Sequence, residues 1–152
     1  MRTLTIDPSG TGTSGLCFIT NKNIEFTQIK NSDWKEHLKL LITYIREKKA
    51  IEQIIYEHTN YIRLHGKDMT SLFKLFGAIE GLIYTFPNIR TIHSIPVLQV
   101  KELYQRIYRG QEEINGLTYK IGRGGGWSYQ GQKISLHQLD ALLLFHLWKR
   151  KG

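Results

Sequence analysis

Three acidic residues occur where predicted secondary-structure elements end, and together they could hold a metal ion. Asp7 ends an alternating polar and apolar run, Glu57 ends a short apolar run, and Asp140 lies in a C-terminal helical pattern. Hard divalent cations prefer oxygen ligands that separate segments bring together. In a basic chain, such a cluster indicates metal-assisted cleavage of a polyanion. The pattern therefore predicts a nuclease.

His137 is a fourth candidate. It stands three residues before Asp140, so both side chains project from the same face of a helix. Its imidazole could bind the metal or orient a water molecule. An aspartate at the end of a strand is, taken alone, more often a turn former than a ligand. The prediction therefore depends on whether the fold brings these residues together.

Charge and length bound the class of protein. The chain has 152 residues and a formal charge of +8, which suits a single domain over residues 1–152. The charge is uneven, because residues 101–152 carry nine basic and four acidic side chains. This asymmetry favours a nucleic-acid partner over a neutral metabolite. The alternative is that the positive charge only aids solubility.

Cys17 is the only cysteine, so no intramolecular disulfide can form. The first residues do not resemble a secretory leader, and no apolar run approaches the roughly 18 residues needed to cross a bilayer. The sequence predicts a cytoplasmic protein without a membrane segment.

Alternation and capping signals predict the order of the elements. Strands at residues 3–6, 15–20 and 24–29 are separated by short turns and should form an antiparallel meander. Later strands at 54–57 and 90–93 are joined by helical crossovers, which favour parallel pairing. A mixed α/β sheet with helices on its faces follows. The helices are expected at residues 34–50, capped by Asp33, and at 71–86, 96–108 and 135–150.

In such a sheet, Asp7 and Glu57 fall at the carboxyl ends of strands that can be neighbours. The last helix can bring His137 and Asp140 alongside them. A single cluster is the expected result, although its members come from three separate parts of the chain.

Five sequence fragments, in their order and spacing, are typical of one family. They are TIDPSGTGTSG at residues 5–15, IIYEHTNYI at 54–62, SLFKLFGAIEGLIY at 71–84, PVLQVK at 96–101 and HQLDALLLF at 137–145. The chain resembles the RuvC-type Holliday junction resolvases of the RNase H-like superfamily. The resemblance implies an RNase H-like mixed five-stranded sheet with helices on both faces. The short length and the glycine run at 124–126 look more like a compact phage or small-genome member.

The resemblance also implies roles for single residues. Asp7, Glu57 and Asp140 match metal-binding acids of the family, and His137 occupies a position where members have aspartate or histidine. These residues would hold two Mg²⁺ ions, with Mn²⁺ able to substitute. An imidazole in place of a carboxylate lowers the negative charge available to the second ion. Lys101 matches a family lysine near the scissile phosphate, where a cation stabilises the transition state.

The implied activity is metal-dependent cleavage of four-way DNA junctions by paired symmetric nicks that leave 5′-phosphate and 3′-hydroxyl ends. Paired nicks need two equivalent active sites, most simply those of a homodimer. Gly77 and Gly81, on the helix at 71–86, would let a partner backbone approach closely, with Phe73 and Leu75 beside them. The alternative is that these glycines pack the helix onto its own sheet.

The segment that follows Glu57 is a candidate DNA contact. Tyr61 could stack on an unpaired base, although Asn60 stands where the family usually has its aromatic residue. Arg63 and Lys67 are typical of phosphate contacts. An ordinary solvated loop is the alternative.

The glycine-rich segment at residues 119–133 carries three further candidates for DNA contact, Lys120, Arg123 and Lys133. It lacks the features of a P-loop and of a dinucleotide-binding fingerprint. We interpret it as a loop that orders on DNA, or as a surface hairpin with Trp127 packed down. The family has a second catalytic lysine in this part of the chain, and either Lys120 or Lys133 could match it.

Competing functions share some of these features. A broader branched-DNA endonuclease or an RNase H-fold RNA nuclease would have the same metal centre. The segment at residues 6–15 also resembles the first phosphate loop of actin-like ATPases, a fold that needs two lobes. A catalytically inert branch-binding protein is the third alternative, and the retained acids argue against it.

Overall fold

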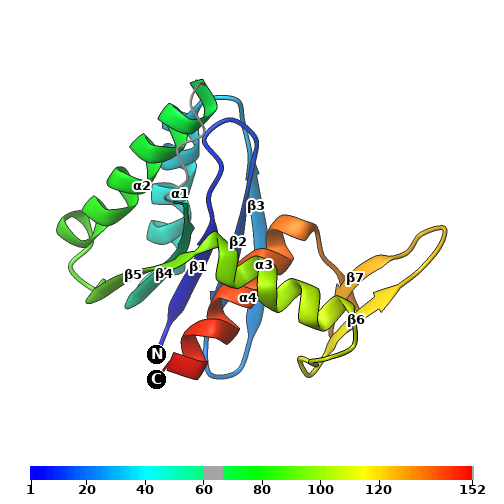
Figure 1. Ribbon diagram of the computed structural model, residues 1–152. Coiled ribbons are helices and arrows are strands. Elements are labelled where there is room, and N and C mark those ends of the chain that lie inside the picture. Colours follow the sequence, from blue (N-terminus) through cyan, green and yellow to red (C-terminus); the bar gives the residue numbers. More distant parts are fainter. Residues whose placement is uncertain (60–66, 152) are drawn as a thin grey trace.

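The main element of the fold is a five-stranded mixed sheet with strand order β3-β2-β1-β4-β5 (Figure 1). The structure is a computed structural model that describes residues 1–59 and 67–151. The first three strands pair antiparallel, and β1, β4 and β5 pair parallel. The predicted mixed α/β sheet is therefore confirmed. The strands are β1 (Thr3–Asp7), β2 (Thr13–Ile19), β3 (Ile24–Lys30), β4 (Gln53–His58) and β5 (Thr91–Pro96).

Helices cover both faces of this sheet (Figure 1). Leu4 and Ile6 of β1 belong to a core that includes residues of α1 (Trp34–Lys48) and α2 (Lys67–Thr85). Thr5 points to the other face, where its hydroxyl donates to the carbonyl of Ala141 at 2.6 Å. That face is covered by α3 (Val97–Tyr108) and α4 (Leu136–Lys151), which contact each other. Since side chains alternate along a strand, Asp7 lies on the same side as α4.

The start of α1 follows the predicted capping signal. The carboxylate of Asp33 accepts a hydrogen bond of 2.9 Å from the backbone amide of Lys35, which satisfies one of the free amides of the first turn. The buried side chains His37, Leu41 and Ile45 recur at helical spacing and hold α1 on the sheet.

α2 buries one of the side chains that we expected to be free for a partner subunit. Its buried side chains are Leu75, Ile79 and Leu82, so the prediction that Leu75 is free for a partner is wrong. A Cβ atom added at Gly77 or Gly81 would meet nothing within 4 Å. The alternative that these glycines pack the helix onto its own sheet is therefore also wrong.

The chain also forms a second, three-stranded antiparallel sheet. Our first interpretation of residues 119–133, as a loop, did not predict it. It comprises β6 (Leu117–Lys120), β7 (Gly126–Tyr129) and β8 (Gln132–Lys133), and it projects beyond the end of α3 (Figure 1). Trp127 is only 5% exposed. The hairpin alternative, with Trp127 packed down, is thus confirmed.

None of the described helices combines the length and the apolar character needed to cross a membrane.

Candidate metal centre

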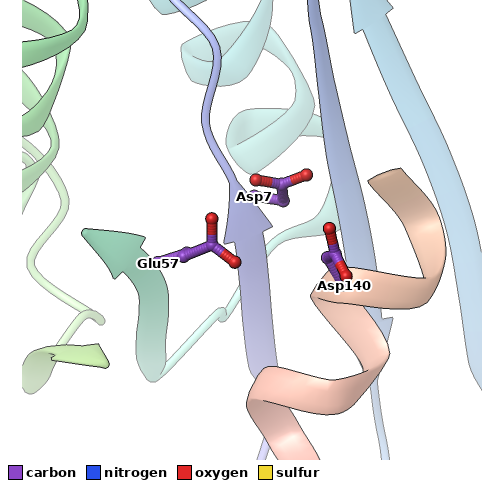
Figure 2. Close-up of side chains that lie close together, drawn as sticks. All are labelled: Asp7, Glu57 and Asp140. Atoms are coloured by element: carbon purple, nitrogen blue, oxygen red, sulfur yellow. The ribbon is translucent and has the colours of Figure 1, made fainter. Parts of the chain in front are cut away.

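Parallel pairing of β1 with β4 places two carboxylates side by side. Ile6 pairs with Tyr56 in the register of the two strands, so Asp7 and Glu57 are the next residues on neighbouring strands and face the same side. Asp140 approaches from α4, and one oxygen from each of the three carboxylates lies within 4.8 Å of the others. Figure 2 shows the three carboxylates converging. The structure therefore brings together the three acids that the sequence singled out.

Gly15 explains how α4 comes so close to the strands. It pairs with Asp7 across β1 and β2, and a Cβ atom built on it would lie 2.1 Å from the carbonyl oxygen of His137. No side chain fits in that space, so only glycine lets the helix backbone lie against β2. Sequence patterns did not identify this role. The available signal was a glycine inside an otherwise apolar strand.

The loop after β1 is held by a buried chain of hydrogen bonds. The Ser9 amide donates to the Ser14 hydroxyl and the Gly12 amide donates to the Ser9 hydroxyl, both at 2.9 Å. The imidazole of His37 bridges Ser14, at 2.9 Å, and the carbonyl of Asn31, at 2.7 Å. Two amides that a phosphate-cradling loop would offer to a ligand are thus already bonded, which argues against the actin-like alternative. The role of His37 was missed from the sequence, although its position among the apolar residues of α1 was a signal.

Burial and crowding of like charges favour the protonated forms of the acids. Burial raises the pKa of Asp7 above 3.8. Burial and the charge of Asp7 raise the pKa of Glu57 to about 9 and that of Asp140 to about 7. A divalent cation would offset this repulsion, and carboxylate oxygens are the ligands that hard cations prefer. The donor set therefore fits a divalent metal ion.

His137 lies next to this centre through a contact with Asp7. Its Nδ1 atom is 3.2 Å from Oδ2 of Asp7, and this hydrogen bond raises the pKa of the imidazole. Within the described part of the chain, the group of closely spaced ligand atoms contains the three carboxylates and not His137. Direct metal binding by His137 stays a prediction, whereas its contact with Asp7 is a feature of the fold.

The predicted cationic side chains do not all lie near the metal centre. Lys101, exposed on α3, lies close enough to lower the pKa of both Glu57 and Asp140. The ammonium of Lys133 instead donates to the carbonyl of Gly124, at 3.3 Å, within the second sheet. Lys120 and Arg123 are exposed in the same region, and no choice between Lys120 and Lys133 as a second catalytic lysine follows from these contacts. The predictions for Asn60, Tyr61 and Arg63 fall outside the described residues, as does the side chain of Lys67.

Comparison with known proteins gave matches among solved structures alone. No protein-family model and no curated protein matches the sequence. Thermus thermophilus RuvC, described as in complex with a Holliday junction substrate, matches with a TM-score of 0.62 and 16% identity over 100% of this chain and 96% of that chain. The fold is the RNase H-like fold of RuvC.

Two further structures show the breadth of this RuvC-type fold. The yeast mitochondrial Holliday junction resolvase Ydc2 matches with a TM-score of 0.58 and 14% identity over 98% of this chain and 78% of that chain. YeaZ from Pseudomonas aeruginosa matches with a TM-score of 0.55 and 13% identity over 99% of this chain and 93% of that chain. At such identities the likeness shows the fold, and function must be argued from the site.

We expect the metal-free protein to lose stability as the pH rises. Asp140 and Glu57 have pKa values of about 7 and about 9 in the folded protein, above their ordinary values of 3.8 and 4.5. Below their ordinary pKa values, the two groups contribute fully to the free energy of unfolding. This contribution is lost as the pH rises through 7 and 9. In EDTA, the melting temperature should fall by at least about 4 °C between roughly pH 5 and pH 8, since one pKa unit is about 1.4 kcal/mol.

Two variants and the addition of Mg²⁺ test whether the buried carboxylates cause this fall in melting temperature. Asp140→Asn should flatten it, whereas Asp33→Asn should not, because asparagine also caps a helix and Asp33 is not one of the three clustered acids. Mg²⁺ should raise the melting temperature more at the higher pH, since it binds deprotonated carboxylates. An unchanged slope in Asp140→Asn would contradict the assignment.

Proposed function

We propose that this protein is a metal-dependent endodeoxyribonuclease that resolves four-way DNA junctions by paired symmetric nicks. The observation that carries the proposal is the convergence of Asp7, Glu57 and Asp140 in a RuvC-type fold. A RuvC of that fold is described as bound to a Holliday junction substrate. The positive charge of the chain suits the same polyanionic partner. The whole chain, residues 1–152, would act as one nuclease domain.

The three carboxylates would hold the metal, with Mg²⁺ as the first choice, two ions as the expected number and Mn²⁺ as a substitute. When bound, such ions act as Lewis acids on the phosphate and lower the pKa of an attacking water. The products would be 5′-phosphate and 3′-hydroxyl ends.

The chain's own side chains would orient the reactants around that centre. His137 hydrogen-bonds to Asp7, so it would hold the carboxylate in place and could bind a metal or orient the water. Lys101 adds a positive charge beside Glu57 and Asp140, where it would stabilise negative charge on the reacting phosphate.

Several cationic side chains would bind the DNA backbone away from the reacting phosphate. Phosphate contacts set the position and orientation of a protein on DNA without reading its sequence. We assign this role to Arg63 and Lys67, which follow β4 in the sequence, and to Lys120, Arg123 and Lys133 in the region of the second sheet. Asn60 and Tyr61 would contact bases.

A homodimer would supply the two active sites that paired nicks need. The face of α2 that carries Gly77 and Gly81 is open, because a Cβ atom at either position would meet nothing within 4 Å. Phe73, on the same helix, is 37% exposed. This open face is the surface that we assign to the partner subunit.

The deciding experiment compares DNA substrates of matched sequence in the presence of Mg²⁺. We expect symmetric nicks in a synthetic four-way junction, at least about tenfold faster than cleavage of a flap, a fork or a linear duplex, because only the junction offers two equivalent strands to two active sites. Equal rates on all branched DNAs would favour the broader structure-selective endonuclease. Cleavage of an RNA–DNA hybrid alone would favour the RNase H-fold RNA nuclease. Tight junction binding without nicking would favour the inert branch-binding protein.

A further inference from the structure

We propose that the pocket between the end of α3 and the second sheet binds one unpaired nucleobase of a DNA that is held at the metal centre. The inference rests on the proposed function, because it requires DNA at that centre. The pocket has a volume of about 590 Å³, within the range of small-molecule sites. It is lined mainly by Tyr108, Glu112, Glu113, Asn115, Tyr119 and Trp127.

The walls of the pocket are aromatic, and part of their surface is free. The ring of Tyr119 lies 4.9 Å from that of Trp127 and 5.6 Å from that of Tyr108, tilted or edge-on in each case. Trp127 is 5% exposed, whereas Tyr108 and Tyr119 are 56% and 46% exposed. Trp127 therefore anchors the group, and the two tyrosines offer ring surface on which a base can stack.

Polar groups on the lining suit a base rather than a phosphate. The exposed carboxylate of Glu113 repels phosphate oxygens and can accept N–H groups from a base edge. The exposed amide of Asn115, also on the lining, offers both a donor and an acceptor to such an edge.

The surrounding charge disfavours a cation, the other class of ligand that aromatic rings and carboxylates bind. Glu112 is paired with Arg150 at 2.5 Å and lies 4.0 Å from Arg106, so much of its charge is offset. Exposed Arg109 and Lys120 flank the lining residues along the chain. An uncharged base meets no repulsion there, and the phosphates on either side of it would gain cationic contacts.

The position of the pocket relates it to the metal centre. Figure 1 shows α3 running from the end of β5 towards β6 and β7. Lys101 lies near the metal centre, since its charge acts on Glu57 and Asp140. It is seven residues before Tyr108, so both residues lie on one face of the helix about 10 Å apart. One face of α3 therefore leads from the metal centre to the pocket. A branch point makes an unpaired base available at little cost.

The test compares junctions that differ at one nucleotide. The nick is first mapped with Mg²⁺. Binding is then measured in EDTA on a series of junctions that carry, at successive positions on either side of the nick, either a mismatched base or an abasic residue. We expect Tyr108→Ala and Tyr119→Ala each to weaken binding of the mismatched junction by roughly 5- to 150-fold. Binding of the abasic junction should not change. Tyr108→Phe should retain the affinity, and Leu40→Ala, which removes a side chain 43% exposed on α1, is the control.

The outcomes separate this proposal from the proposed function. A protein that nicks junctions but binds the mismatched and abasic forms equally well overturns the base pocket and leaves the resolvase proposal standing. A protein that neither binds nor nicks junctions overturns both. Competition by tetramethylammonium ions, with equal binding of the two junctions, would identify a cation site and overturn the base pocket. Melting temperatures of the variants within a few degrees of the parent exclude misfolding as the cause of lost affinity.

Discussion

Replacing Asp7 with asparagine should abolish nicking of a four-way junction while leaving junction binding intact. Asp7 lies between Glu57 and Asp140 in the described centre and is also the hydrogen-bond partner of His137. The neutral amide removes one anionic ligand but keeps the shape of the side chain. Since metal ions contribute several kcal/mol to transition-state stabilisation, we expect the nicking rate to fall at least about 1000-fold.

Binding and melting measurements give the controls for this variant. Removing a buried charge that repels its neighbours should raise the melting temperature in EDTA, because burial and crowding penalise the charged form. Asp33→Asn, at the exposed cap of α1, should nick like the parent. Nicking by Asp7→Asn at the rate of the parent would remove Asp7 from the reaction and the proposed centre with it.

Gly15→Ala should damage both stability and activity, although it adds a single methyl group. The new Cβ would stand 2.1 Å from the carbonyl oxygen of His137 and 2.8 Å from the amide nitrogen of Gln138. Backbone atoms cannot rotate away, so α4 must move. Overpacking of this kind costs about 1 to 3 kcal/mol, or roughly 2 to 4 °C in melting temperature per kcal/mol. A shift of about 1 Å in Asp140 should lower the nicking rate on the order of 100-fold.

Gly77→Ala is the matched control, since it makes the same chemical change on α2. Its Cβ would meet nothing within 4 Å, and alanine in place of a helical glycine stabilises by up to about 1 kcal/mol. The melting temperature should therefore rise. Circular dichroism melts of the two variants give the comparison of stability. Nicking by Gly15→Ala is compared with the parent alone, because Gly77 lies on the face that we assign to the partner subunit. A Gly15→Ala protein that is as stable and active as the parent would show that α4 does not depend on this contact.

Local patterns in the sequence were sufficient for most of the main sheet and its helices. The alternation in β1 and the cap at Asp33 each act over a few residues, so they can be predicted without knowledge of the fold. The second sheet was missed as a sheet because Gly122, Gly124 and Gly126 interrupt any strand pattern. In the structure these glycines have positive φ angles: Gly122 and Gly124 lie in the turn between β6 and β7, and Gly126 begins β7.

The candidate site, too, could be predicted from the sequence only in part. The identity of the acids and their place at the ends of elements follow from the sequence, because ligand chemistry depends on residue type and strand ends are local features. Their convergence within 4.8 Å depends on parallel pairing of β1 with β4 and on the approach of α4 over Gly15. These contacts join residues more than 45 positions apart.

The sequence by itself determined the donor atoms, the positive charge and the order of the elements. Only the tertiary structure decided that Leu75 is buried, that the glycines of α2 face open space, and that Tyr108, Tyr119 and Trp127 enclose a pocket. The physical reason is that a periodic pattern shows which residues share a face, whereas the neighbour of that face is set by packing between distant segments.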